Sequence, residues 1–326
     1  KTVVMEKKLE LNPLKTIQEL KQLGLIHLIN PWMILLPWVS KLTKKHTLLI
    51  LFVMFLLGSA YPTGKLGLNA SIPPILFGAI RMTIVFIFLI PFCKIEIPNK
   101  KYLFSLIGFS LSMGAGVNLF LYLSINESNI LSPIVIGAQL SIPLAIVCSS
   151  IFIGESISYK KWILIITSFF GIILIGFDPK IVDEILGMLL ICCMAFFYAL
   201  AQVFSRYLKE LDVKFTNAFM GFVGCIVLLF LSILFEGNTI FHLKNMNTNA
   251  WLMVLHHGVL CSLMGHMSMF YLYKFYSVGE VLPFYSLFPI FGIILSFFIF
   301  GEIPTLIVII GGIIVITSVF LLQKTS

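Results

Sequence analysis

The pentapeptide Ile151-Phe152-Ile153-Gly154-Glu155 recurs, with conservative changes, as Phe298-Ile299-Phe300-Gly301-Glu302. Each copy ends a long apolar run, and Pro133 and Pro283 begin the same two runs. Similarity between distant segments is typical of a chain that contains an internal repeat. We therefore expect two related halves, with residues 151–155 and 298–302 at equivalent positions.

A second match extends the repeat toward the beginning of each half. Residues 57–60 (LGSA) align with residues 198–201 (YALA), and the same shift places Lys65 on Arg206. We therefore divide the chain beyond residue 46 into two repeats, residues 47–178 and residues 179–326.

The composition is that of a membrane protein. Hydrophobic residues make up 59% of the chain and charged residues 11%, and the mean hydropathy is +1.05. Soluble domains are about 45–50% apolar and about 25% charged, so a water-soluble fold is excluded. The net charge of +8 does not indicate nucleic-acid binding, because the basic residues are scattered at the ends of apolar runs.

Ten apolar runs are long enough to cross a bilayer, since about 20 apolar residues in a helix span about 30 Å of hydrocarbon. They cover residues 47–64, 72–92, 102–125, 129–153, 161–177, 184–206, 215–235, 251–275, 280–300 and 305–322. Helices satisfy their own backbone hydrogen bonds in lipid. The sequence therefore predicts an all-α polytopic membrane protein with ten transmembrane helices.

The basic residues predict the orientation of these spans. One side of the membrane collects most of them: Lys41, Lys44, Lys45, Lys94, Lys100, Lys101, Lys160, Lys161, Arg206, Lys209, Lys214, Lys274 and Lys324. The other side has Lys65, Lys180 and Lys244. Because cytoplasmic loops carry the excess of Lys and Arg, both termini are predicted to be cytoplasmic, in a bacterial inner membrane.

Five spans in each half make the repeat an inverted one. An odd number of spans reverses the direction of the chain, so Glu155 is expected on the cytoplasmic side and Glu302 on the opposite side. Inverted repeats are a known route to alternating access, because two related halves can exchange conformations about an axis in the membrane plane. The pattern favours a transporter.

Together these motifs resemble the EamA-like branch of the drug/metabolite transporter superfamily. The resemblance rests on the paired Gly-Glu motifs, the basic residue that ends spans 1 and 6, Arg81 in the segment FGAIRM (77–82), and ten short spans over roughly residues 47–322. The chain looks most similar to the amino-acid metabolite exporters of that branch. Where the family usually has Trp near the middle of spans 1 and 6, this chain has Leu57 and Tyr198.

Residues 1–46 have no counterpart in that family. Their apolar part, residues 23–38, is short and is interrupted by two prolines. We expect a cytoplasmic or interfacial extension, with Trp32 and Trp38 at the level of the lipid headgroups.

Arg81 is the one arginine inside a predicted span. A charge near the bilayer centre costs about 2.5–3.5 kcal/mol on insertion scales, so such a residue is a candidate for function. Two roles stay open for Arg81: direct contact with the substrate, or a structural or gating role.

Spans 4 and 9 contain prolines at related places. In transporters with inverted repeats, interrupted helices free backbone groups that bind the substrate. The residues that this comparison selects are Pro133, Gln139, Pro143, Pro283, Tyr285 and Pro289. The alternative is that the prolines only kink these helices to fit the bundle.

Polar pairs spaced by four residues share one helix face and are further candidates for the wall of a cavity. Asn118 and Tyr122 form such a pair in span 3, and Tyr198 and Gln202 form one in span 6. Hydrogen bonding between helices is the alternative use of these side chains.

Span 8 adds His257 and His266 as candidates for polar contact or proton transfer, since an unperturbed histidine titrates near pH 6.5. These two lie nine residues apart, on opposite faces of a helix, and the neighbours His256 and His257 are expected to point apart. We therefore predict neither a metal site nor a cofactor.

The acidic residues of the predicted core lie at span ends or in loops: Glu127, Glu155, Asp178, Asp183, Glu184, Glu236, Glu280 and Glu302. A relay of carboxylates through the membrane is therefore not predicted. Either a histidine carries protons, or the protein is a facilitator or exchanger driven by the gradient of its substrate.

The favoured function is export of amino acids or related small polar metabolites, with the metabolite and the lipid bilayer as partners. Uptake or exchange of another metabolite is the alternative within the transporter class. The sequence lacks the intramembrane Asp pair or Ser-His arrangement of a membrane enzyme, and a scaffold without transport is the remaining class. Substrate, direction, coupling ion and oligomeric state stay open.

Overall fold

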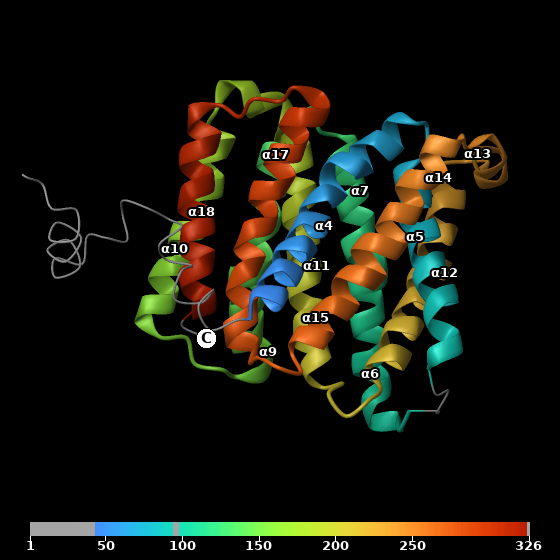
Figure 1. The fold of residues 1–326 in the computed structure, drawn as a ribbon, viewed down its shortest axis with the longest axis horizontal. Helices are drawn as coiled ribbons and strands as arrows, with labels where there is room; N and C mark the ends of the chain where they lie inside the picture. The colour runs from blue at the N-terminus through green and yellow to red at the C-terminus, as the bar shows by residue number, and fades with distance from the viewer. Residues whose placement is uncertain (1–42, 94–97, 325–326) are drawn as a thin grey trace, which may run out of the picture. The chain divides into compact units, whose positions relative to one another are not determined.

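The computed structural model describes residues 43–93 and 98–324. The chain divides into two units, Lys1–Leu49 and Ile50–Ser326. Most of the predicted N-terminal extension, with Trp32 and Trp38, lies outside the described residues. In the second unit, every described element is a helix (Figure 1).

The predicted number of spans is confirmed, because the described part holds ten helical segments long and apolar enough to cross a membrane. Those of the first half are α4 (Lys44–Asn69); α5 (Pro74–Leu89) with η1 (Ile90–Phe92); α6 (Lys100–Phe109), η2 (Ser110–Gly116) and α7 (Val117–Asn126); α8 (Ser132–Gly137), η3 (Ala138–Leu140) and α9 (Ser141–Ile153); and α10 (Tyr159–Gly176).

The second half repeats this order. Its elements are η4 (Pro179–Glu184) and α11 (Ile185–Arg206); α12 (Val213–Phe235); the connecting α13 (Thr239–Asn245); α14 (Thr248–Leu255), η5 (His256–Gly265) and α15 (His266–Leu272); α16 (Val278–Val281), η6 (Leu282–Leu287) and α17 (Phe288–Phe300); and α18 (Leu306–Lys324). The chain is thus an all-α membrane protein of two inverted five-span halves.

The residues that end the helices explain the repeated Gly-Glu motif. Gly154 and Gly301 follow α9 and α17 with φ angles of 79° and 69°, and each N–H bonds to a carbonyl of the last helical turn. Glycine adopts this left-handed conformation without steric cost, so it ends both helices. Each glutamate then leaves the helix at the face of the bundle.

The first span is longer than its apolar run, which ends near residue 64, because α4 continues to Asn69. Lys65 lies inside the helix, and its Nζ donates to the carbonyls of Ile125, Asn126 and Ser128 at 3.1, 3.3 and 2.6 Å. These bonds satisfy the ammonium group within the protein. The helix therefore continues past Lys65, the basic residue that was expected to end span 1.

Two pairs of equivalent spans are interrupted. Spans 4 and 9 each contain a 3₁₀ segment, η3 and η6, before a 13-residue helix. Spans 3 and 8 each contain a π-helical segment, η2 and η5. Since π-helical turns are frequent at functional sites, these segments indicate a site in the middle of the bundle, built from both halves.

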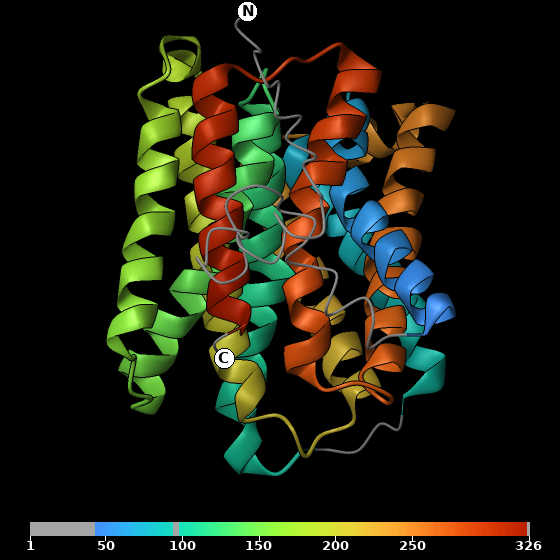
Figure 2. The same cartoon turned by 60° about the vertical axis from the view of Figure 1, so that its left-hand side comes forward.

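The helices pack in pairs that follow the repeat. α5 packs against α12, and α10 packs against α18, so spans 2 and 7 and spans 5 and 10 meet their own equivalents. Figures 1 and 2 both show α10 beside α18 at one side of the bundle. We call the end with α13 the upper face and the end with the C-terminus of α18 the lower face, as in Figure 1.

Glycines allow the closest of these contacts. A Cβ atom on Gly224 of α12 would lie 2.8 Å from the backbone of Gly114 in η2, and one on Gly311 of α18 would lie 2.7 Å from the carbonyl of Gly171 in α10. Such distances are too short for any side chain, so these helices touch through their backbones. Small residues at helix crossings are typical of membrane bundles.

We predict that Gly224→Ala lowers the free energy of unfolding by about 1–3 kcal/mol, because the added methyl group overpacks the contact with Gly114. Thermal unfolding of the purified protein in detergent measures the effect. Gly176→Ala is the matched control, since nothing lies within 4 Å of a Cβ there. Equal melting temperatures for the two variants would contradict the assigned contact.

Candidate functional site: a cavity between the two halves

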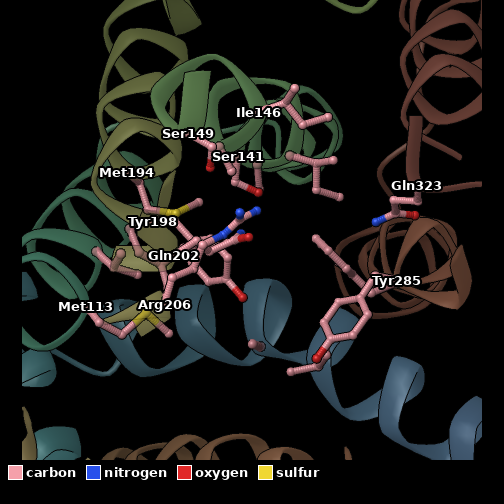
Figure 3. A pocket seen from close by; sticks show the side chains of 18 of the residues that line it. Met113, Ser141, Ile146, Ser149, Met194, Tyr198, Gln202, Arg206, Tyr285 and Gln323 are labelled. Atoms are coloured by element: carbon pink, nitrogen blue, oxygen red, sulfur yellow. The ribbon is translucent and has the colours of Figure 1, made fainter. Parts of the chain in front are cut away.

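A cavity of about 700 Å³ lies between the halves, within the unit Ile50–Ser326. Its wall includes residues at the lower face, among them Glu155, Lys161 and Arg206, and it extends inward as far as Tyr61 and Leu121. In Figure 3, Tyr198 and Gln202 stand on one side and Tyr285 and Gln323 on the other. The cavity is therefore lined by both repeats and reached from the lower face.

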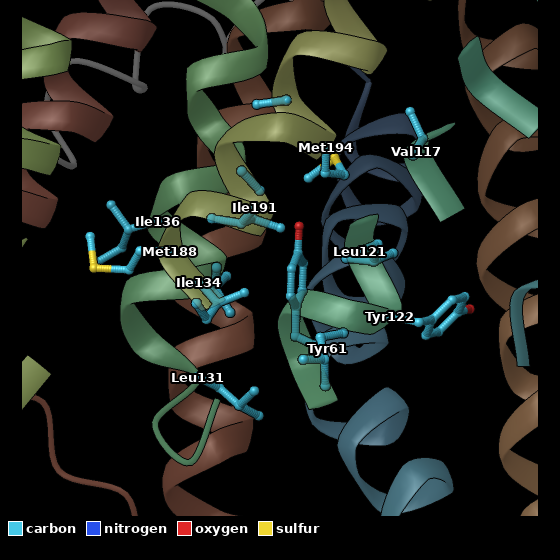
Figure 4. Packing of buried hydrophobic residues seen from close by; sticks show 14 of the residues in the cluster. Tyr61, Val117, Leu121, Tyr122, Leu131, Ile134, Ile136, Met188, Ile191 and Met194 are labelled. Atoms are coloured by element: carbon cyan, nitrogen blue, oxygen red, sulfur yellow. The ribbon is translucent and has the colours of Figure 1, made fainter. Parts of the chain in front are cut away.

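Apolar packing closes the inner end of this cavity. Tyr61 is 6% exposed, and its ring stacks on Phe288 with centroids 6.1 Å apart. Figure 4 shows the Tyr61 ring between Ile191 and Leu121, in the cluster of buried side chains. Tyr61 thus separates the cavity from the upper face.

A second cavity of about 580 Å³ lies between α5, α11 and α12 and also reaches the lower face, where Lys209 and Lys214 line it. Arg81, Tyr198 and Gln202 line both cavities. These side chains therefore stand between two adjoining spaces.

Arg81 is held by two hydrogen bonds from different halves. Its Nε donates to Ser262 Oγ of η5 at 2.9 Å, and its Nη1 donates to Tyr122 OH of α7 at 3.3 Å. The Ser262 hydroxyl in turn donates to the carbonyl of His257 at 2.9 Å. The guanidinium is therefore fixed in direction and still lines both cavities.

The chain of polar contacts continues behind Arg81. Tyr122 OH lies 2.8 Å from Nδ1 of His257, and Nε2 of His257 lies 3.1 Å from Thr63 Oγ1. Tyr122 and His257 are fully buried. Burying unpaired polar groups is costly. These hydrogen-bonded contacts therefore fix spans 1, 2, 3 and 8 relative to one another.

The histidine geometry differs from our expectation. His256 and His257 were expected to point apart, yet their ring centroids are 5.7 Å apart and both rings contact Thr63 Oγ1, His256 through Nδ1 at 3.3 Å. The π-helical geometry of η5, which starts at His256, alters the angle between neighbouring side chains. Among the described residues, no cluster of three metal-binding side chains occurs.

The remaining candidates occupy different places. Asn118 lines the second cavity, and its amide nitrogen donates to the carbonyls of Met113 and Gly114 in η2. Gln139 is buried away from both linings, where its Nε2 donates to the carbonyl of Tyr285 at 3.1 Å and links η3 to η6. His266 begins α15, and its side chain lies outside the described part.

The prolines lie at the starts of helical segments. Pro133 is the second residue of α8 and Pro289 the second of α17, while Pro283 lies in η6 and Pro143 in the first turn of α9. At these positions the missing N–H has no partner within the same helix to lose. The 3₁₀ segments, rather than unwound loops, are the interruptions of spans 4 and 9.

At the upper face, carboxylates of the second half bind helix starts of the first half. Glu302 accepts hydrogen bonds from the N–H groups of Leu131 and Ser132 at 2.9 and 2.8 Å, and from the Ser132 hydroxyl. Glu236 accepts from the N–H groups of Ile75 and Leu76 at 2.6 and 2.9 Å. A carboxylate at a helix N-terminus is favoured by hydrogen bonding and by the helix dipole.

Two further carboxylates join the halves at this face. Glu184 accepts from the N–H of Asn129 at 2.8 Å, and the Thr305 hydroxyl donates to Asp178. Glu184 and Asp178 are 2% and 3% exposed. We refer to Asp178, Glu184, Glu236 and Glu302 as the upper-face carboxylates.

The lower face is joined by exposed side chains instead. Arg206 pairs with Glu155, and their side chains are 44% and 46% exposed. Tyr102 OH donates to Glu210 and Lys101 Nζ lies 3.4 Å from it, and these contacts lower the pKa of Glu210. Solvent screens exposed pairs of this kind, so they hold the halves together weakly.

Several residues of the site were not among the candidates predicted from the sequence. Ser59 and Thr63 lie one turn apart on α4, so the rule used for span 3 and span 6 would have found them. Gln323 lines the first cavity near the end of α18, one residue beyond the predicted span 305–322. Tyr61 and Tyr273 carry no local signal that separates them from core tyrosines.

A ten-span bundle of inverted halves, with a cavity open at one face and closed at the other, defines a multispan membrane carrier for small molecules. The chain matches the EamA-like transporter family over residues 44–177 and 185–323. It belongs to that family, which is a family of carriers and not of enzymes.

The relatives are transporters of unassigned substrate. The chain is 28% identical over 174 residues to the uncharacterized transporter YdfC of Bacillus subtilis (strain 168), covering 52% of this chain and 55% of YdfC. It is 29% identical over 198 residues to the uncharacterized transporter YoaV of the same strain, covering 57% and 66%. It is also 29% identical over 157 residues to an uncharacterized transporter in the sor 3′ region of Acidianus ambivalens, covering 48% and 59%.

The aligned parts therefore span about half to two thirds of these curated relatives. A protein of known crystal structure has the same fold, with a TM-score of 0.56 at 14% identity over 85% of this chain and 96% of its own. The family and the ten spans together make this chain a multi-pass membrane transporter.

We predict that Glu302→Gln accelerates hydrogen exchange at Leu131 and Ser132 by about tenfold or more. The amide keeps the shape of the carboxylate but replaces one acceptor oxygen, and a hydrogen bond to a charged group contributes about 1.5–3 kcal/mol. Hydrogen–deuterium exchange with mass spectrometry measures the rate. Glu127→Gln is the control, because Glu127 bonds to the exposed side chain of Asn126; unchanged exchange in Glu302→Gln would refute the assigned cap.

Proposed function

We propose that this carrier exports amino acids or related small metabolites that bear a carboxylate, by alternating access. The observation that carries the proposal is Arg81, whose guanidinium lines both cavities and is aimed by Ser262 and Tyr122. A planar guanidinium recognises a carboxylate through two parallel hydrogen bonds.

The charges around the cavities support an anionic group on the substrate. Five basic residues line the two cavities: Arg81, Lys161, Arg206, Lys209 and Lys214. Glu155 is the acidic residue of the first lining, and it is paired with Arg206. The net field therefore attracts anions and zwitterions through their carboxylates.

The rest of the lining supports a substrate of mixed polarity. Met113, Val117, Leu121 and Met194 supply an apolar wall beside Arg81. Tyr198 and Gln202 supply polar groups on α11. A cavity of about 700 Å³ is within the usual range for small-molecule sites, so a metabolite of amino-acid size fits with room for water.

The upper-face carboxylates support alternating access. They bond the two halves at one face while the cavity reaches the other, which is the arrangement of a carrier open to one side. Transport then requires these bonds to break and equivalent contacts to form at the lower face. Inverted repeats supply two such conformations of similar energy.

We assign the lower face to the cytoplasm, with both termini there, in the plasma membrane of a prokaryote. The distribution of Lys and Arg supports this orientation. A cavity open to the cytoplasm is the loading state of an exporter. Export rather than uptake rests on the resemblance to amino-acid metabolite exporters. We also propose that residues 47–178 and 179–326 are the two moving halves, preceded by the extension 1–46.

We predict saturable counterflow of at least one amino acid in proteoliposomes, tested with a panel of radiolabelled amino acids and their metabolites. Arg81→Gln should lower this flux about tenfold or more, and Arg81→Lys should lower it as well, because the ammonium lacks the fork of donors. Lys160→Gln is the control, because Lys160 is exposed and lines neither cavity, and it should change the flux less than about twofold.

Two results would overturn the proposal. Absence of saturable flux for every member of the panel would refute the substrate class. Full flux in Arg81→Gln would refute the role of Arg81 as the carboxylate-binding group.

A further inference from the structure

His256 has neighbours that differ in kind from those of His257. Its Nε2 lies 3.2 Å from Ser59 Oγ, and its Nδ1 lies 3.3 Å from Thr63 Oγ1 and 3.5 Å from Cys261 Sγ. Ser59, Thr63 and Cys261 each have a backbone carbonyl as a second partner. The direction of each bond therefore decides which protonation state the ring adopts.

The hydroxyl and thiol groups around the His256 ring each have a backbone carbonyl as an acceptor. Ser59 Oγ donates to the carbonyl of Leu56 at 2.8 Å, and Thr63 Oγ1 donates to the carbonyl of Ser59 at 2.6 Å. Cys261 Sγ donates to the same Leu56 carbonyl at 3.2 Å. Since a hydroxyl has one proton, Ser59 and Thr63 present oxygen lone pairs to the two ring nitrogens of His256 whenever they donate to these carbonyls.

A neutral imidazole has one N–H and leaves one nitrogen as an acceptor, so it satisfies one of these two contacts. An imidazolium has two N–H groups and satisfies both, with Nε2–H directed to Ser59 and Nδ1–H directed to Thr63. The arrangement at His256 therefore accommodates the protonated ring.

His257 has the opposite arrangement. Thr63 Oγ1, whose proton is used on Ser59, accepts from Nε2–H of His257. Arg81 Nη1 donates to Tyr122 OH, so the Tyr122 proton is free for Nδ1 of His257. The hydrogen-bonding groups of Thr63, His257 and Tyr122 all have partners when the His257 ring is neutral. A further proton on Nδ1 of His257 would break its hydrogen bond with Tyr122.

We infer that His256 is a proton-binding site directly behind the wall of the transport cavity. Cys261, which contacts Nδ1, lines the first cavity, so His256 lies one side chain behind the cavity lining. Release of the proton needs only rotation of the Ser59 hydroxyl, which then donates to Nε2. Both protonation states of His256 are thus accommodated without movement of a helix.

The charged and titratable groups around His256 make its proton sensitive to the contents of the cavity. They are Arg81 of α5, Tyr122 of α7, and His257 and Cys261 of η5; the charge of Arg81 opposes that of the imidazolium. A carboxylate bound at Arg81 would neutralise this repulsion, so proton and substrate binding strengthen one another. The proton site stands without the proposed function, whereas this coupling rests on it.

Nitrogen-15 NMR of ring-labelled histidine tests the site without any substrate, on the full chain in lipid nanodiscs between about pH 5 and pH 8. We expect one histidine, assigned as His256 by its loss in His256→Asn, to pass reversibly from a neutral to a doubly protonated ring. His257 should keep a single N–H at Nε2 throughout. The His242→Asn variant, which lies in α13, is the assignment control.

Ser59→Ala provides a second test that keeps the histidine. It removes the acceptor for Nε2–H and should lower the proton affinity of His256 about tenfold, the fold-change of one hydrogen bond. Ser168→Ala in α10 is the matched control. Ser168 is buried and donates to the carbonyl three residues earlier at 2.7 Å, and Ser59 makes the same kind of bond at 2.8 Å. It should leave the titration unchanged.

A His256 ring that stays neutral over this range, or a titration that Ser59→Ala does not shift, would overturn the inference. Either result is independent of whether amino acids are transported. Conversely, a titrating His256 in a protein with no amino-acid flux would retain the proton site and refute only the proposed substrate class.

Discussion

The bonds between upper-face carboxylates and helix starts of the other half are the constraint on which the arrangement of the halves depends. Glu302 and Glu236 of the second half receive the first N–H groups of α8 and α5. At a helix start near the bilayer, these N–H groups lack partners in their own helix and need acceptors. Because each carboxylate supplies two bonds of about 1.5–3 kcal/mol, the halves are held at the upper face, and the cavity reaches the lower face.

The two Gly-Glu motifs are alike in sequence and differ in partners. Glu302 binds backbone N–H groups of the opposite half, whereas its equivalent Glu155 pairs with the exposed Arg206. In an inverted repeat, equivalent residues exchange environments when the carrier changes state. The difference between the two glutamates is therefore the local signature of one conformation. Arg81 is held by Tyr122 of α7 in span 3 and by Ser262 of the π-helical η5 in span 8, and it lies where the two halves meet.

Hydropathy and charge were sufficient for the number of spans, because crossing a bilayer constrains the length and polarity of each helix directly. The repeat placed Gly154 and Gly301 correctly at the ends of helices. The π-helical segments in spans 3 and 8 contain no proline and left no local signal. The pairing of His256 with Ser59 and Thr63 depends on how spans 1 and 8 cross, and residue spacing within one span carries no information on that crossing.

The central claim is that the cavity opens to the cytoplasm and is closed on the other side by the upper-face carboxylates and Tyr61. Gln202, which lines both cavities, reports on this directly when it is replaced by cysteine. A membrane-impermeant maleimide, applied to right-side-out and inside-out vesicles without substrate, would be located by peptide mass spectrometry. Labelling of Gln202→Cys from the cytoplasmic side alone is the predicted result. Labelling from the opposite side, or equally from both sides, would contradict it.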